Sequence, residues 1–415
     1  MATVKPFRAL RPKKEFAAQL AAPPYDVLSS EEAREMAKGN PYSFLHVNKP
    51  EIDLPPETDP YDVRVYQKSA ENLQKLINDG IMFQEEKPAF YVYRQIMGNH
   101  QQVGIAACAS VDEYEKNIIK KHELTRPDKE DDRVQHILHL NAQVGPVFLT
   151  YIAQQNIDAL INEIIKGQPE YDFTSPDNVQ HTLWVVKEDS TIRKIIEYFE
   201  AIDTLYVADG HHRSAAAQRV REKKRNENPH HTGEEEYNYF LTVIFPHNQM
   251  QILDYNRVVK DLYGLAPSEF LAKIREKFKV DTVGEGEAVK PTKKHELAMY
   301  LEGKWYRLSP LPGSFDSHDP VKQLDVSILQ ENLLAPILGI GDPRKDKRID
   351  FVGGIRGLKE LEKRVDSGQW QVAFALYPTA IEDLIAIADA GKIMPPKSTW
   401  FEPKLRSGLV VHLLD

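Results

Sequence analysis

The 415-residue sequence contains a single cysteine, Cys108. One cysteine excludes an internal disulfide and a metal cage of several thiolates, so we expect a reducing compartment. No apolar run reaches the ~20 residues of a membrane-spanning helix, and the N-terminus lacks the apolar stretch of a secretory signal. The net charge of −9 argues against a broad basic face, so nucleic acid is not an expected partner. These absences predict a cytoplasmic protein without membrane association.

The most informative stretch is residues 204–217. Its apolar start, Thr204–Ala208, predicts a short buried strand, Asp209 and Gly210 predict a tight turn, and the alanine-rich remainder predicts a helix. The first turn of that helix holds three residues that carry or can carry positive charge: His211, His212 and Arg213. A capped helix after a buried strand would explain the turn but not these cations, which oppose the helix dipole. Because a helix start binds anions, we predict a phosphate site here.

Three further polar stretches can complete such a site. They contain Asp26 behind two prolines, then Glu123, Arg126 and Arg133 within residues 121–133, and finally Lys397, Ser398, Thr399 and Lys404 in a proline-rich segment. Arginine, lysine and hydroxyl groups suit phosphate, and carboxylates suit a metal ion or a proton. The other interpretation is a solvated loop before an acidic helical turn for residues 121–133, and a stiff proline loop for the last segment. Both interpretations are left open by the residues alone.

Hydrophobic patterning predicts a mixed α/β protein. The expected strands are 41–47, 90–94, 102–109, 145–151, 182–187, 204–208, 239–245, 251–259, 295–301, 304–308, 349–352 and 371–376. The expected helices are 31–38, 61–79, 127–141, 211–221, 267–278, 326–334 and 379–390. The strand, the glycine pair and the helix around residues 349–356 predict a second, weaker anion site.

The chain resembles a family of bacterial and archaeal proteins known as domain of unknown function 1015. The resemblance rests on five separated motifs: Phe7–Pro12, Ala22–Val27, Lys121–Arg126, Ala208–Arg213 and Met394–Lys404. More distantly, Asp209, Gly210, His212 and Arg213 are similar to the phosphate-binding turn of the ParB/sulfiredoxin-like superfamily. That superfamily includes nucleotide-binding ParB and kinases that phosphorylate free L-serine with ADP or ATP.

The resemblance implies a ParB/sulfiredoxin-like nucleotide-binding core in residues 1–260, with a large insertion at about 50–180. Residues 261–415 would form an added α/β region that supplies the lysine-rich loop. The implied activity is a phosphotransferase that uses ATP or ADP with Mg²⁺ on a small hydroxylated metabolite, free L-serine first. The alternative is a ParB-like regulatory protein that binds a nucleotide without kinase activity. Whether the chain forms a homo-oligomer is left open.

The same resemblance assigns roles to individual residues. Asp26 or Glu123 would take the proton of the acceptor hydroxyl, and Asp209 would bind Mg²⁺ or orient a histidine such as His212. The nucleotide would be held by Gly210, His211, His212, Arg213, Arg126, Arg133, Lys397, Ser398, Thr399 and Lys404.

Overall fold

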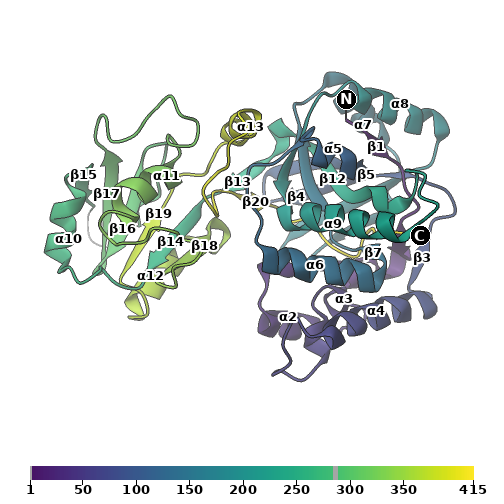
Figure 1. Ribbon diagram of the computed structural model, residues 1–415, viewed down its shortest axis with the longest axis horizontal. Coiled ribbons are helices and arrows are strands. Elements are labelled where there is room, and N and C mark those ends of the chain that lie inside the picture. Colours follow the sequence, from purple (N-terminus) through teal and green to yellow (C-terminus); the bar gives the residue numbers. More distant parts are fainter. Residues whose placement is uncertain (1, 284–287) are drawn as a thin grey trace. The chain divides into compact units, whose positions relative to one another are not determined.

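The computed structural model describes residues 2–283 and 288–415 and confirms a mixed α/β protein (Figure 1). The chain divides into two compact units. The first unit comprises Met1–Lys121, Thr125–Met250 and Pro403–Asp415. The second comprises His122–Leu124 and Gln251–Glu402. The last segment of the chain therefore belongs to the same unit as its beginning.

Within the described residues, the first unit is built on a sheet of nine strands in the order β6-β11-β8-β12-β5-β4-β10-β9, with β1 paired to β5. These strands are β1 (Val4–Lys5), β4 (Phe90–Met97), β5 (His100–Ser110), β6 (Ile119–Lys120), β8 (Val147–Tyr151), β9 (Tyr171–Thr174), β10 (Val179–Val186), β11 (Leu205–Asp209) and β12 (Tyr239–Pro246). The pairs β11–β6 and β12–β8 are parallel, and the other pairs are antiparallel. The two strands expected at 90–94 and 102–109 form a hairpin, β4 with β5, across Gly98, whose φ of +58° suits a tight turn.

The helices of the first unit bury apolar faces against this sheet and against one another. They are α1 (Ala17–Leu20), α2 (Ser30–Ala37), α3 (Leu45–Asn48), α4 (Val63–Asn78), α5 (Val111–Glu115), α6 (Pro127–Leu140), α7 (Gln155–Ile164), α8 (Asp189–Glu200) and α9 (His211–Glu227). Ile157 of α7 and Phe199 of α8 join the core of the sheet. Helices α6 and α9 lie side by side (Figure 1), joined by a small cluster that includes Val134 and Val220.

Smaller pairings complete this unit. β2 (Leu10–Pro12) pairs with β3 (Met82–Gln84), and β21 (His412–Leu413) pairs with β7 (Ala142–Gln143). The second pairing anchors the end of the chain beside the C-terminus of α6.

The prediction of a strand at residues 41–47 is wrong. The structure has turns followed by α3, and Phe44, Leu45 and Val47 of this stretch are buried in a core cluster with Leu73 of α4. A short apolar run fits a buried helical turn as well as a strand, because periodicity does not separate the two over so few residues. Packing against α4 decides between them here.

The second unit has a six-stranded antiparallel sheet in the order β15-β17-β16-β19-β14-β18 within its described residues. Its strands are β14 (Tyr255–Val259), β15 (Phe278–Thr282), β16 (Leu297–Leu301), β17 (Lys304–Pro310), β18 (Ile349–Gly353) and β19 (Val372–Ala375). A separate pair joins β13 (Gln251–Leu253) to β20 (Trp400–Glu402). The helices are α10 (Pro267–Ile274), α11 (Asp325–Leu329), which continues as a π-helical turn (Gln330–Leu334), α12 (Leu358–Asp366) and α13 (Ile381–Asp389).

After β18, where a second anion site is predicted, the chain forms a short 3-10 turn, Gly354–Arg356. Helix α12 begins only at Leu358, so Gly353 and Gly354 do not form its start. The two glycines are required by packing instead. A Cβ at Gly353 would lie 2.8 Å from the Trp400 ring, and one at Gly354 would lie 2.5 Å from Asp254 Oδ1.

Among the described helices, none combines the length and the apolar character needed to cross a lipid bilayer.

Candidate functional site

The predicted turn between a strand and a helix forms at the end of β11. Gly210 has φ +100° and ψ +29°, a left-handed conformation that a side chain disfavours. A Cβ at this position would also lie 3.2 Å from Arg213 Nε. Within the part of the chain that the structure describes, no side chain caps the start of α9. The first backbone N–H groups of α9 can therefore serve an anion.

His212 connects this helix start to the preceding polar stretch. Its Nε2 accepts a hydrogen bond of 3.1 Å from the backbone N–H of Arg126. Because that nitrogen acts as an acceptor, the proton of the neutral ring resides on Nδ1. The side chain of Arg126 is exposed and pairs with Asp128 at 2.9 Å. Arg126 thus contacts the helix start through its backbone, not through its guanidinium.

Asp209, the last residue of β11, is paired with a lysine from the end of the chain. Lys404 Nζ lies 2.9 Å from Asp209 Oδ2. The backbone carbonyl of Lys404 accepts a hydrogen bond from Gln95 Nε2, which holds this segment against β4. Burial opposes the ionisation of Asp209, but the charges of Lys404 and Arg213 outweigh burial and hold the pKa of Asp209 well below its usual value.

Arg213 is largely enclosed, with 10% of its side chain exposed. Nη1 donates to the carbonyl of Pro146, and Nη2 lies 3.6 Å from Asp26 Oδ2. Its Nε is buried and has no hydrogen-bond partner among the described residues. Burial opposes the charge, but Asp26 and Asp209 raise the pKa of Arg213. Arg213 is thus charged and has a donor to spare.

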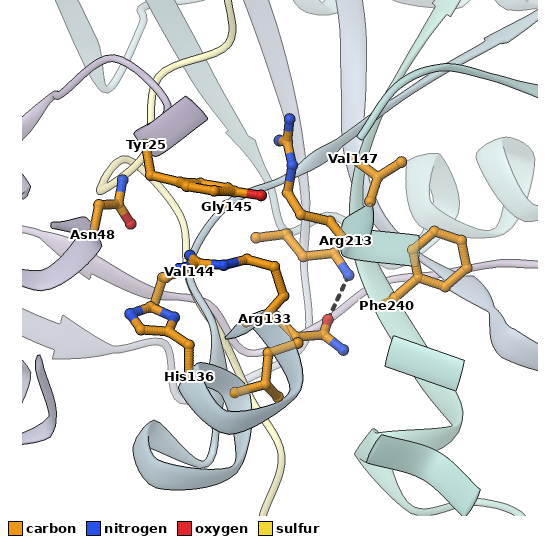
Figure 2. Close-up of a pocket in the computed structure, with 12 residues that line it drawn as sticks. Tyr25, Asn48, Arg133, His136, Val144, Gly145, Val147, Arg213 and Phe240 are labelled. Carbon is orange, nitrogen blue, oxygen red and sulfur yellow. Dashed lines mark hydrogen bonds between the residues drawn. The ribbon is translucent and has the colours of Figure 1, made fainter. Parts of the chain in front are cut away.

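A small cavity lies beside Arg213 (Figure 2). It is lined by Tyr25, Asn48, Arg133, His136, Ile137, Gln143, Val144, Gly145, Val147, Arg213, Phe240 and Leu241. Figure 2 shows the Tyr25 ring against the Arg133 side chain, and the Arg133 guanidinium lies 3.8 Å from the ring centre. Asn48 Nδ2 is buried without a hydrogen-bond partner in the described chain. The cavity therefore offers unused donors and suits an oxygen-rich, anionic group.

The wall of the cavity holds its charges in a fixed arrangement. Nη2 of Arg133 pairs with Asp132 at 2.6 Å, and the Tyr66 hydroxyl donates to the other oxygen of Asp132 at 3.0 Å. Burial, partly offset by Arg133, raises the pKa of Tyr25 to about 12. Its hydroxyl is therefore protonated at neutral pH and can donate a hydrogen bond.

The first unit brings together many of the residues predicted from sequence: Asp26, Arg126, Arg133, Asp209, Gly210, His211, His212, Arg213 and Lys404. The second unit holds Glu123, Lys397, Ser398 and Thr399. In that unit the Ser398 hydroxyl donates to the carbonyl of Pro395 at 2.6 Å. Lys397 is exposed, and its Nζ lies 5.6 Å from the centre of the Tyr255 ring.

Sequence reasoning missed two cavity residues. Asn48 ends α3, directly after the stretch expected to be a strand, and it lies in no motif. His136 lies on the buried face of α6, where a histidine ordinarily has only a packing role. Tyr25 did have a signal, because Pro23 and Pro24 fix an extended backbone that presents it.

Comparisons with known proteins give a family and several remote structures. Residues 4–327 match the model of a family described as protein of unknown function (DUF1015). No curated protein matches the sequence. A free serine kinase in complex with AMP is 13% identical, with 72% of this chain and 86% of that chain covered and a TM-score of 0.37. A variant of the free serine kinase with ADP is 13% identical, with 72% and 87% covered and a TM-score of 0.36. A conserved hypothetical protein from Pyrococcus furiosus is 15% identical, with 75% and 95% covered and a TM-score of 0.37. TM-scores of this size do not establish a common fold.

Proposed function

The chain belongs to the family described as protein of unknown function (DUF1015), and we propose that it is a nucleotide-dependent phosphotransferase. Its donor is ATP or ADP with Mg²⁺, and its acceptor is a small hydroxylated metabolite, with free L-serine the leading candidate. The observation that carries this proposal is the uncapped start of α9 beside the buried Arg213 with its unused Nε donor. Positive charge and the N–H groups of an uncapped helix start in one place are what a transferring phosphate requires.

The phosphate groups lie at the start of α9 in this proposal. Backbone N–H groups of the first helical turn and Nε of Arg213 donate to the phosphate oxygens. Gly210 allows the Arg213 side chain to lie close to the helix start, because glycine has no Cβ on the side that Arg213 occupies. Lys404 adds a second positive charge next to this helix start.

Asp26 is the proposed proton acceptor. It lies 3.6 Å from Arg213 and 39% of its side chain is exposed, so a bound hydroxyl can reach it. Asp26 takes the proton that the acceptor hydroxyl loses as its oxygen bonds to the transferred phosphorus. The bond from that phosphorus to the bridging oxygen breaks at the same time, and the nucleotide leaves with one phosphate fewer. Glu123 is the alternative base.

Asp209 is the proposed Mg²⁺ ligand of the first unit. A magnesium ion would neutralise charge on the phosphate oxygens. Because Lys404 already occupies Oδ2 of Asp209, metal binding at that oxygen requires the ion pair to open. The other carboxylate oxygen is the simpler ligand.

The cavity beside Arg213 is the proposed site for the acceptor. Its volume, measured as the space open to the centre of a water molecule, is about 30 Å³. One water needs ~10–15 Å³ on this measure, so the cavity has room for about two oxygen-sized atoms. A carboxylate fits that space better than a tetrahedral phosphate does. Tyr25, Asn48 and Arg133 would bind it, which favours a hydroxylated carboxylic acid such as L-serine.

The test is phosphate transfer measured by mass spectrometry, from ATP or ADP with Mg²⁺ to a panel of free hydroxylated metabolites that includes L-serine. We expect one phosphorylated product, which Arg213→Ala abolishes. Arg219→Ala is the matched control, because Arg219 is on the same helix but is 41% exposed and pairs with Glu130 and Asp131. Nucleotide binding without any product would favour the regulatory role. If the chain neither binds a nucleotide nor forms a product, the phosphate site itself is contradicted.

A further inference from the structure

The chain returns to the first unit with residues 403–407, which we call the tether. Lys404 of the tether pairs with Asp209 at the start of α9. Ser407 of the tether exchanges two backbone hydrogen bonds with Ala22, of 2.9 and 3.1 Å. One short piece of chain thus contacts both the start of α9 and an N-terminal segment that lies far from it in the sequence.

The N-terminal segment that the tether contacts leads directly into the proposed site. Ala22 is followed by two prolines, which keep the backbone extended, and then by Tyr25 and Asp26 in a short 3-10 turn. Asp26 lies 3.6 Å from Arg213. Because the prolines leave the backbone little freedom, the position of Ala22 largely determines the position of Asp26.

Arg406 is the central anchor of the tether, and only 7% of it is exposed. Its Nη2 donates to Ser175 Oγ at 3.1 Å and pairs with Asp177, and its Nε donates to His181 Nε2 at 3.3 Å. Burial and the charge of Arg406 lower the pKa of His181 to about 3, so the ring is neutral and can accept this hydrogen bond. The other ring nitrogen, Nδ1, lies 2.7 Å from the Tyr93 hydroxyl of β4. Arg406 therefore fastens the tether to residues that the sheet holds in place.

A chain of buried amides also holds the tether. Gln102 Nε2 donates to Gln95 Oε1 at 3.0 Å, and Gln95 Nε2 donates to the carbonyl of Lys404 at 2.9 Å. The two glutamines lie opposite each other in the β4–β5 hairpin and are fully buried. Burial of two polar side chains is unfavourable unless their hydrogen bonds are satisfied, and an aliphatic pair would fill the same strands without that requirement. The tether therefore has more polar anchors than the packing of the sheet requires.

We propose that Arg406 is a positioning residue of the site. It holds the tether in place between its contact with Ala22 and its contact with Asp209, and thereby sets the position of Asp26 relative to the start of α9. The consequence for phosphate transfer rests on the proposed function. The anchoring of the tether does not, because each of these contacts lies within the first unit.

The anchoring is tested by hydrogen exchange of the full chain, followed by mass spectrometry of its peptides. In Arg406→Met we expect the amides of residues 20–28 and 403–408 to exchange at least about tenfold faster, since a lost charge-assisted hydrogen bond corresponds to a factor of ~10 or more. The amides of the β4–β5 hairpin should keep their rate. Arg221→Met is the matched control, because Arg221 is 8% exposed and also pairs with carboxylates, but it joins α9 to α5.

Two results would overturn the anchoring role of Arg406. One is unchanged exchange of both segments in a folded Arg406→Met protein. The other is uniformly faster exchange throughout the first unit, which would show that Arg406 contributes only to global stability. If Arg406→Met does not fold, Arg406→Lys replaces it, since lysine keeps the charge but cannot bridge Ser175 and His181. The same two segments should then be the ones that exchange faster.

The effect on the reaction is tested by comparing kcat for phosphate transfer with the calorimetric affinity for ADP. In Arg406→Met we expect kcat to fall at least about tenfold, because a displaced base loses the geometry of the reacting groups. The affinity for ADP should change by less than about threefold, since Arg213 stays in place and Gln95 still holds Lys404. Arg221→Met should change neither quantity. A loss of affinity as large as the loss of kcat would overturn the positioning role.

The two proposals fail in different ways. If the wild-type chain transfers phosphate to no acceptor, the proposed function and the catalytic consequence of Arg406 fall together. Hydrogen exchange then still decides whether Arg406 anchors the tether. If transfer occurs and Arg406→Met leaves kcat unchanged, the positioning role is overturned while the proposed function stands.

Discussion

Lys404 Nζ and Asp209 Oδ2 lie 2.9 Å apart although 195 positions separate the two residues in the sequence. The chain leaves the first unit after Met250 and returns at Pro403. Lys404, the second residue of the returning segment, forms this ion pair. The charge at the start of α9 is thus balanced by a residue from the last segment of the chain. The ion pair lies where the backbone N–H groups of α9 are uncapped.

Lys404→Met should reduce stability, because it leaves a half-buried carboxylate with fewer positive neighbours. We expect the free energy of unfolding to fall by about 1–2 kcal/mol, measured by urea denaturation at pH 7. Lys166→Met is the control, because its ion pair with Glu163 is shorter still, at 2.6 Å, but is mostly exposed. An exposed pair of this kind contributes only ~0–1 kcal/mol. Equal effects of the two substitutions would show that the Lys404–Asp209 pair is no stronger than a surface contact.

Asp26→Asn should lower the rate of phosphate transfer without weakening the binding of the nucleotide. If Asp26 takes the hydroxyl proton, kcat should fall by about 10²–10⁴, while the calorimetric affinity for the nucleotide should change by less than about threefold. Glu123→Gln is the parallel variant, since Glu123 is the other candidate base. The residue whose substitution lowers kcat is the base. Turnover that survives in both single variants would exclude both residues from that role.

Local sequence patterns predict the phosphate element well. An apolar run, the pair Asp209–Gly210 and an alanine-rich segment specify β11, the turn and α9, because each of these preferences is local. The hairpin at Gly98 and the capping box of Ser29 with Glu32 follow from the same kind of signal.

Contacts over long sequence distances are not predictable in this way. Nothing near Lys404 indicates that it pairs with Asp209, and nothing near Arg257 indicates that it serves the carbonyl of Lys397. Asn48 has no signal at all, because its role depends on the cavity that distant elements form around it. Such residues can be assigned to a site only once the fold is known.

Gly210→Ala should damage both the backbone and the site. The left-handed φ of +100° is unfavourable for alanine, and the new Cβ would lie 3.2 Å from Arg213 Nε. We expect a loss of about 1–3 kcal/mol in the free energy of unfolding and at least about tenfold weaker nucleotide binding, because Arg213 must move. Gly39→Ala is the control, since Gly39 has φ +75° with nothing within 4 Å of its Cβ position. It should lose stability but keep nucleotide affinity, and equal affinity losses in both variants would refute the steric argument.

Two buried histidines should make the fold sensitive to mild acid. Burial, together with the charge of Arg133, lowers the pKa of His136 to about 3, and burial together with Arg406 lowers the pKa of His181 to about 3. An unfolded histidine titrates near ~6.5, so between about pH 6.5 and 3 the unfolded chain binds protons that the folded chain excludes. The free energy of unfolding therefore falls as the pH drops through this window, by up to ~1.4 kcal/mol per pH unit for each histidine.

His136→Gln tests this origin, with urea denaturation followed between pH 4.5 and 7.5. The Nε2 of His136 lies 3.0 Å from the carbonyl of Val47 and 2.9 Å from Ser69 Oγ, contacts that a glutamine amide can replace in part. We expect a lower stability at pH 7 but a shallower fall toward pH 4.5 than in the wild type. The exposed His318→Gln should leave the slope unchanged. If the free energy of unfolding of His136→Gln falls with pH in parallel with that of the wild type, His136 is protonated in the folded chain. Its positive charge would then lie close to that of Arg133 at the cavity.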